Sequence, residues 1–114
     1  MTKETPQMPT MSFDDFAAFQ RELFAECRGI AGMKGKEYAR AGNRFANFTR
    51  MSQDNPKFTP EDIALIFFTK HLDAIKSYIE TEQVYSEPIR GRFIDAIVYL
   101  TLIYGMIEAR SAQQ

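Results

Sequence analysis

The strongest chemical signal in the sequence lies near the C-terminus, where charged residues meet a long apolar segment. Residues 86–100 include one glutamate, two arginines and one aspartate, and residues 93–107 are apolar almost throughout. A helix that is apolar nearly all the way round is buried, and a carboxylate inside it must be paired, metal-bound or protonated. Asp95 is therefore the leading candidate for a catalytic or metal-binding residue, and Glu87 precedes it near the start of the same predicted helix.

Asp95 and the pair Lys70 and His71 also allow a structural interpretation. Asp95 could instead belong to a buried salt bridge. The candidate partners for such a bridge are Arg90, Arg92 and Lys70. Lys70 and His71 could place an ammonium and an imidazole beside an anion, but a single histidine is more often a hydrogen-bonded structural group.

Other acidic residues give weaker signals. Glu37 lies in a basic segment that includes Lys34, where cations keep a carboxylate ionised and can also bind phosphate. A surface ion pair explains that pattern equally well. Glu22 and Glu26 lie one helical turn apart, a spacing that suits Mg²⁺, but they fall outside the apolar stripe of their helix and are interpreted as solvent-exposed.

An aromatic pair in the middle of the chain has two interpretations. Phe45 and Phe48 could form a shelf for a base, with the Asn47 amide reading the base edge. Two phenylalanines at helical spacing more often belong to a core, and that interpretation is favoured.

Three long helices are predicted to position these residues. The first opens at Ser12, an N-cap with an acid three residues on, and frays at Gly29 and Gly32. Apolar residues recur along it at spacings of three and four, which predicts one buried stripe. The members of this stripe are Phe13, Phe16, Phe19, Leu23, Phe24, Cys27 and Ile30.

A loop with short helical turns is predicted over residues 33–48, followed by the second and third helices. The second helix begins with Thr59 as N-cap and runs to Thr81 or Glu82. The third is capped by Ser86 and extends to about residue 109. The predicted buried face of the second helix consists of Ile63, Ile66, Phe67, Lys70, Ala74, Ile75, Tyr78 and Ile79.

These patterns predict an all-α helical bundle, because no alternation typical of a strand occurs between turn signals. Residues 1–11 read as a flexible leader and residues 12–114 as a single domain. Three long helices leave more apolar surface than they can bury among themselves, which predicts a homodimer or a larger oligomer.

Composition narrows the classes of function. A formal net charge of −1 argues against nucleic acid as a partner, because sequence-independent binding needs an excess of lysine and arginine. The single Cys27 can form no intramolecular disulfide and continues an apolar helix face, so a core residue in a cytoplasmic protein is expected. The apolar segment 93–107 is too short to cross a membrane.

The order of several short motifs resembles one family. These are KGKEY at 34–38, RFANF at 44–48, KH at 70–71, SEPI at 86–89 and RFIDAIVYL at 92–100. Together they are similar to small, mostly phage-borne proteins of the MazG-like group, the all-α nucleoside triphosphate pyrophosphohydrolases and related nucleotide-modification-associated domains. A phage protein of this kind would act in the cytosol of a bacterial host.

The resemblance implies an oligomeric helical protein that binds a nucleotide between helices, with acidic side chains holding Mg²⁺ on its phosphates. Asp95 matches the aspartate of the group's Glu-x-x-Asp element. Arg92 stands in place of that element's glutamate, and no Glu-x-x-x-Glu pair occurs around Lys70 and His71.

Three functions follow as expectations. As an enzyme, the chain would cleave a triphosphate to a monophosphate and pyrophosphate, with Mg²⁺ on Glu37, Glu87 and Asp95. As a non-catalytic binder, it would hold the nucleotide without hydrolysing it. As a helical adaptor in nucleotide modification or anti-defence, it would bind no nucleotide. The phosphate-binding candidates are Lys34, Arg44, Lys70, His71 and Arg92, and the base-binding candidates are Tyr38, Phe45 and Asn47.

Overall fold

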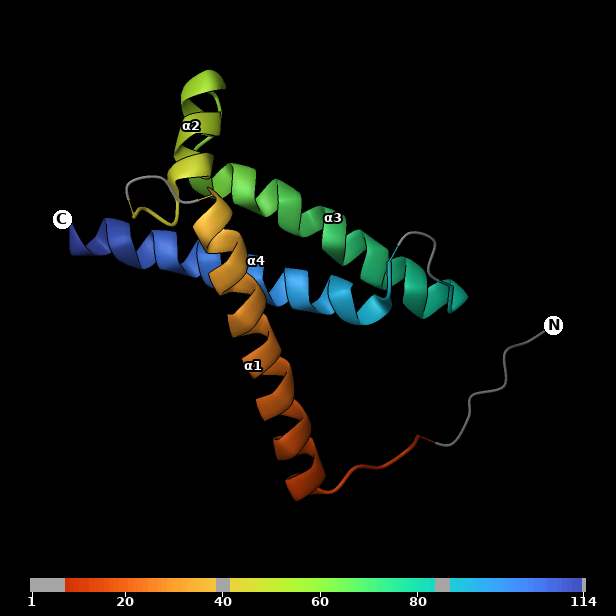
Figure 1. Cartoon of the computed structure of the whole chain (residues 1–114). Coiled ribbons are helices and arrows are strands. Elements are labelled where there is room, and N and C mark those ends of the chain that lie inside the picture. The colour runs from red at the N-terminus through yellow and green to blue at the C-terminus, as the bar shows by residue number, and fades with distance from the viewer. Residues whose placement is uncertain (1–7, 39–41, 84–86, 114) are drawn as a thin grey trace.

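The computed structural model describes residues 8–38, 42–83 and 87–113, and within these ranges it describes all side chains except those of residues 34–38. Its helices are α1 (Phe13–Tyr38), α2 (Ala46–Asp54), α3 (Pro60–Thr81) and α4 (Ile89–Ala112). The described part of the chain contains no β-strand, so the predicted all-α class and its three long helices are confirmed. In Figure 1, α3 and α4 lie side by side, α2 lies near the start of α3, and α1 crosses α4 and projects away from it.

The first helix starts where predicted but runs further. The Asp15 backbone N–H donates to the Ser12 hydroxyl at 3.0 Å, which satisfies one of the free donors at the helix start. The predicted end at Gly29 and Gly32 is wrong, because α1 continues to Tyr38. Each glycine costs a helix about 1 kcal/mol, but Ile30 and Ala31, between the two glycines, pack against the buried cluster that contains Cys27 and residues of α4.

The loop predicted over residues 33–48 is wrong at both ends. Residues 33–38 belong to α1, and α2 begins at Ala46. Phe48 is only 2% exposed, and Phe45 and Met51 pack against the same cluster. The spacing of three residues places these side chains on one face of the helical segment, and that face packs in the core. The interpretation of Phe45 and Phe48 as core residues is therefore confirmed.

The predicted boundaries of α3 are confirmed. Thr59 and Asp62 form a reciprocal capping box, with the Asp62 N–H donating to the Thr59 hydroxyl and the Thr59 N–H donating to the Asp62 carboxylate. The helix ends at Thr81, before Glu82 in a left-handed conformation with φ of 58°.

The predicted buried face of α3 is partly wrong. Ile63 and Ile75 are buried as expected, but Ile66 and Lys70 are exposed, as is Ile79. The side chain buried near Lys70 is instead that of the next residue, His71, which is 7% exposed. One residue corresponds to a turn of about 100° around the helix axis, so the true face is rotated toward the histidine.

The last helix, α4, lies at the centre of the molecule and carries a core on each of two faces. Its predicted cap, Ser86, lies outside the described residues; α4 itself begins at Ile89 after Pro88 and ends at Ala112. The first core, between α2, α3 and α4, contains Phe48, Ile63, Ala64 and Met106, and the second, between α1 and α4, contains Cys27, Ile94 and Val98. None of the helices described here is long and apolar enough to cross a membrane.

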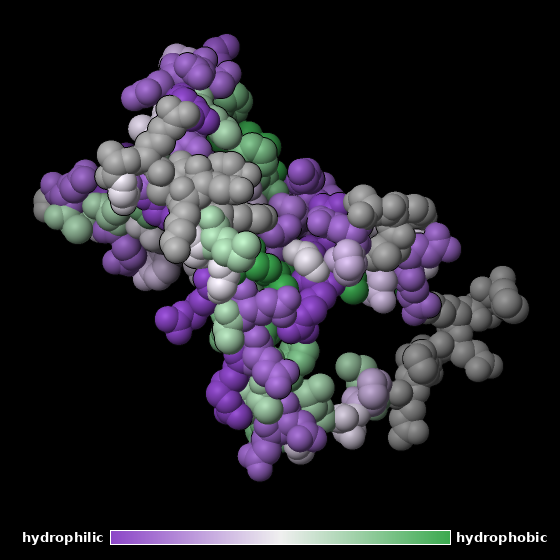
Figure 2. Space-filling model, in the orientation of Figure 1, coloured by the Kyte–Doolittle hydropathy of each residue, from purple (hydrophilic) through white to green (hydrophobic). Residues whose placement is uncertain are grey.

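Much apolar surface remains uncovered in a single chain. Phe13, at the start of α1, is 96% exposed. Figure 2 shows apolar residues at the surface along the projecting part of α1, interspersed with hydrophilic ones. The expectation that residues 93–107 are buried on all sides is also wrong for one chain, since Tyr104 is 63% exposed.

Candidate functional site

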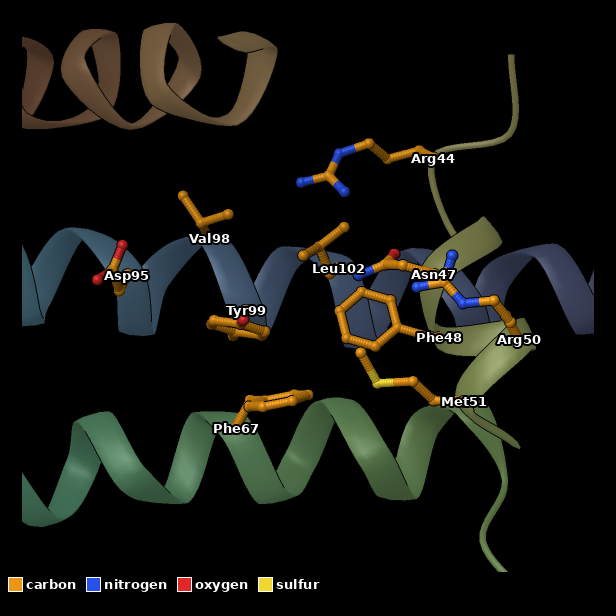
Figure 3. A pocket seen from close by; sticks show the side chains of 10 residues that line it. All are labelled: Arg44, Asn47, Phe48, Arg50, Met51, Phe67, Asp95, Val98, Tyr99 and Leu102. Carbon is orange, nitrogen blue, oxygen red and sulfur yellow. The ribbon is translucent and has the colours of Figure 1, made fainter. Parts of the chain in front are cut away.

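A pocket of about 290 Å³ opens between α2, with the residue Arg44 that precedes it, and the facing sides of α3 and α4. It is lined by Arg44, Asn47, Phe48, Arg50, Met51, Phe67, Asp95, Val98, Tyr99 and Leu102. Figure 3 shows Asp95 at one end of this pocket and Arg50 at the other, with Arg44 reaching back along α4 between them. The site therefore has a carboxylate end and a cationic end, joined by an aromatic wall.

Asp95 lies in a group of three possible metal ligands. One ligand atom each from His71 on α3, Glu87 just before α4 and Asp95 on α4 all lie within 4.8 Å of one another. His71 Nδ1 is 3.8 Å from Asp95 Oδ2, and the two side chains are 9% and 17% exposed. We call these three residues the ligand cluster. The prediction that Asp95 is buried is confirmed in part, since its side chain is only partly exposed.

His71 sits in an apolar, aromatic environment. Its ring stacks on Tyr99 with centroids 5.5 Å apart, and Tyr99 stacks on Phe67 at 6.0 Å. Burial lowers the pKa of the His71 imidazole below its ordinary value of 6.5, although the nearby Asp95 carboxylate acts in the opposite direction. Burial therefore favours the neutral form of the imidazole. Its Nδ1 atom is buried and has no hydrogen-bond partner among the described residues.

Two arginines near the start of α4 each pair with a glutamate. Arg92 Nε is 3.0 Å from Glu87 Oε1, so one member of the ligand cluster already has a cationic neighbour. Arg90 extends in a different direction and pairs with Glu26 of α1 at 2.7 Å. Glu26 and Glu22 are exposed, which confirms their interpretation as solvent-facing residues.

A second hollow reaches the ligand cluster from the side of α1. It has a volume of about 320 Å³ and is lined by Ile30, Met33, Glu87, Gly91, Ile94 and Asp95. Asp95 thus lines both hollows, and Glu87 lines the second. The carboxylates of the cluster are accessible to a small ion or ligand without any change in the helices.

The structure brings together part of the predicted site. Asp95, Glu87 and His71 form the ligand cluster, Arg92 contacts Glu87, and Arg44 and Asn47 line the pocket. The Asn47 Oδ1 atom is buried there without a hydrogen-bond partner in the described residues, so this amide could accept a bond from a ligand.

Other predicted residues lie elsewhere. Phe45 lines a different hollow, together with Pro60 and Met106. Its ring packs closely on Gly105, because a Cβ atom at that position would lie only 3.3 Å from the Phe45 Cζ atom. Lys70 is on the exposed side of α3, not in its buried face. The side chains of Lys34, Glu37 and Tyr38 lie outside the described residues.

Two contributors were missed by the sequence interpretation. Arg50 lies three residues after Asn47 and shares its face of α2, a relation that was hidden because residues up to 48 were interpreted as a loop. Tyr99 lies four residues after Asp95, one helical turn along α4, and spacing alone would have placed it beside the carboxylate.

Cys27 makes no contribution to this site. It is buried between α1 and α4, and burial raises the pKa of its thiol above 9.0, so the thiolate is disfavoured. Its interpretation as a core residue is confirmed. Searches with protein-family models, curated proteins and solved structures found no match to this chain.

Proposed function

We propose that the protein binds a nucleoside triphosphate in the pocket between α2, α3 and α4 and hydrolyses it to a nucleoside monophosphate and pyrophosphate with a divalent cation. In this reaction the oxygen of a water molecule bonds to the α-phosphorus. The bond between the α-phosphorus and the α–β bridging oxygen breaks, and pyrophosphate leaves. The observation that carries the proposal is the double position of Asp95. It belongs to the ligand cluster and also lines the pocket that contains two arginines.

The ligand cluster suits a divalent cation by the chemistry of its donors. Two carboxylates and a neutral imidazole provide charge and lone pairs. The His71 Nδ1 atom has no hydrogen-bond partner in the described residues, so its lone pair is available to an ion when the imidazole proton is on Nε2. Imidazole is a poor ligand for Mg²⁺ but a good one for Zn²⁺ and Fe²⁺, and Mn²⁺ accepts both donor types. We therefore add Mn²⁺ and Zn²⁺ to the Mg²⁺ expected from the sequence. Such an ion would polarise a phosphoryl oxygen and lower the pKa of a bound water.

The opposite end of the pocket suits phosphate groups and a base. Arg44 and Arg50 present guanidinium groups, which bind phosphate oxygens in pairs of hydrogen bonds. Asn47 offers an amide acceptor for a base or a sugar hydroxyl. The pocket volume of about 290 Å³ lies just below the range of about 300–1,000 Å³ that small-molecule pockets span.

One observation favours binding without hydrolysis as the second candidate. Arg92 pairs with Glu87 at 3.0 Å and offsets one negative charge of the ligand cluster. A cation must compete with this guanidinium for the carboxylate, whereas a phosphate could bind Arg92 directly. In that case ligand binding would be insensitive to a chelator.

The decisive experiment is a thermal-shift screen of ribo- and deoxynucleoside triphosphates in EDTA, Mg²⁺, Mn²⁺ and Zn²⁺, coupled to an assay for pyrophosphate. The enzyme proposal predicts that Mn²⁺ increases the nucleotide-dependent rise in Tm, and that pyrophosphate forms. Asp95→Asn should abolish pyrophosphate release, and Arg44→Ala should weaken nucleotide binding about tenfold or more, as expected for loss of a charged hydrogen bond. Arg21→Ala, an exposed residue on α1, is the matched control and should bind like the wild type.

The possible outcomes separate the candidates. If nucleotide binding is equal in EDTA and in Mn²⁺, is lost in Arg92→Ala, and no pyrophosphate forms, the protein is a non-catalytic nucleotide binder and the enzyme proposal is wrong. No shift with any nucleotide under any condition would reject both and leave the helical adaptor.

A further inference from the structure

Arg92 is paired with one of the three residues of the ligand cluster. Its Nε atom is 3.0 Å from Glu87 Oε1, and the two side chains are 18% and 40% exposed. The pair is therefore partly withdrawn from water, where ions in solution screen it less than an exposed pair. A cation that binds Glu87 must share this carboxylate with the guanidinium or displace it.

The charges around the cluster favour displacement. Glu87 and Asp95 carry two negative charges, and Arg92 offsets one of them. His71 adds no negative charge, because burial lowers its pKa and favours the neutral imidazole. A divalent cation held by both carboxylates would balance their charge without help, so a guanidinium that stayed at Glu87 would be repelled by the ion. The ion and Arg92 therefore compete for Glu87.

Arg92 also lies on the face of α4 that lines the pocket between α2, α3 and α4. Arg92, Asp95 and Tyr99 follow one another at spacings of three and four, which places them on one face of the helix. Asp95 and Tyr99 both line that pocket. A guanidinium displaced from Glu87 is thus about one helical turn from Asp95, and it can bind a phosphate group held there.

We propose that Glu87 and Arg92 form a switch that couples cation binding to nucleotide binding. Without a cation, Glu87 holds Arg92. A divalent cation replaces the guanidinium at Glu87, and Arg92 then binds a phosphate oxygen of the nucleotide. Because coupling between two ligands is reciprocal, each ligand increases the affinity for the other. This inference rests on the cation and phosphate sites of the proposed function, but not on hydrolysis.

The first test is a calorimetric titration of the protein with Mn²⁺ alone. Arg92→Gln should bind Mn²⁺ about two- to fivefold more tightly than the wild type, as expected when a partly exposed ion pair no longer competes. If Arg92 only maintained the shape of the site, its loss would weaken Mn²⁺ binding instead. Arg90→Gln is the matched control, because Arg90 lies in the same turn of α4 but pairs with Glu26, outside the cluster. This control should bind Mn²⁺ like the wild type.

The second test uses inorganic pyrophosphate in EDTA, where no cation takes part. Glu87→Gln should bind pyrophosphate about two- to fivefold more tightly than the wild type, because a neutral amide holds Arg92 less strongly than a carboxylate does. The double variant Glu87→Gln/Arg92→Gln should bind it no more tightly than Arg92→Gln. A gain that persisted without Arg92 would be the general effect of removing a negative charge.

A third measurement uses the wild type and needs no substitution. In NMR spectra of the arginine side chains, Zn²⁺ should shift the Nε–H signal of Arg92, whose Nε atom lies 3.0 Å from Glu87, and leave that of Arg90 in place.

Four results would each overturn the proposal. They are a wild type that binds no Mn²⁺, an Arg92→Gln variant that binds Mn²⁺ no more tightly than the wild type, an equal gain in Arg90→Gln, and a pyrophosphate gain that persists in the double variant. If the variants behave as expected but no nucleotide is hydrolysed, the switch is supported and the enzyme proposal alone is wrong.

Discussion

At the residue level, the contact between Asp95 and His71 couples a carboxylate to an imidazole that burial keeps neutral. Their atoms approach to 3.8 Å, too far for a hydrogen bond and close enough for one ion to bind both. Hydrophobic and aromatic neighbours exclude water from the imidazole, since His71 stacks on Tyr99. A neutral imidazole retains the lone pair that a metal ligand needs.

The titration of His71 can be followed through stability, because it is the only histidine of the chain. Burial lowers its pKa in the folded protein below 6.5, so the unfolded chain takes up a proton at a higher pH than the folded chain. Stability therefore decreases as the pH falls below 6.5, down to the pKa of the folded state. We expect the Tm in chelator to be steady near neutral pH and to fall as the solution is acidified through that range.

His71→Gln is the control for this pH dependence. Glutamine does not titrate, so the decrease in Tm just below pH 6.5 should become smaller while the acid unfolding caused by carboxylates remains. Equal slopes for wild type and variant in this range would show that the imidazole is not buried in its neutral form.

At the level of single elements, α3 is stabilised at its start by a local motif. The Thr59 hydroxyl accepts from the Asp62 N–H at 3.1 Å. Thr59→Ala should lower the free energy of unfolding by about 1 kcal/mol, because an N–H at the helix start loses its acceptor. Urea denaturation followed by circular dichroism measures this change.

The control is the same substitution in the middle of the same helix. The Thr69 hydroxyl donates to the Leu65 carbonyl, a local bond that contributes little to helix stability. Because alanine is the better helix former, Thr69→Ala should leave stability unchanged or raise it by a few tenths of a kcal/mol. A Thr59→Ala variant as stable as Thr69→Ala would contradict the role of the cap.

The elements also show which features were predictable. Helix starts at Ser12 and Thr59 were correct because capping depends on residues within one turn. The end of α1 at Gly29 was wrong because packing on α4 outweighs the local cost of glycine. The buried face of α3 was wrong at Lys70 because the rotation of a helix about its axis depends on its neighbours.

The same distinction holds for the site. Asp95 was identified because a carboxylate inside an apolar run is a local anomaly. The association of Glu87 and His71 with it depends on how α3 and α4 align, and residue spacing in the sequence does not contain that alignment. Arg50 remained hidden because α2 was interpreted as a loop.

At the level of the whole molecule, α4 joins two cores that share no buried residue. The core around Phe48 holds α2 and α3 to α4, whereas α1 is held chiefly through the core that contains Ile94. This arrangement makes α1 the part of the described fold that can separate while the rest persists. Hydrogen exchange distinguishes such local opening from global unfolding.

We therefore expect Ile94→Ala to release α1 selectively. Ile94 is 2% exposed, and truncation of a buried isoleucine costs about 2–5 kcal/mol. In this variant, amides of α1 should exchange much faster, while those of α3 keep most of their protection. Ile79→Ala, at a side chain that is 64% exposed, should change stability by less than about 0.5 kcal/mol. Uniform loss of protection across α1, α3 and α4 would mean that the two cores unfold as one cooperative unit, and that α4 transmits the loss of one core fully to the other.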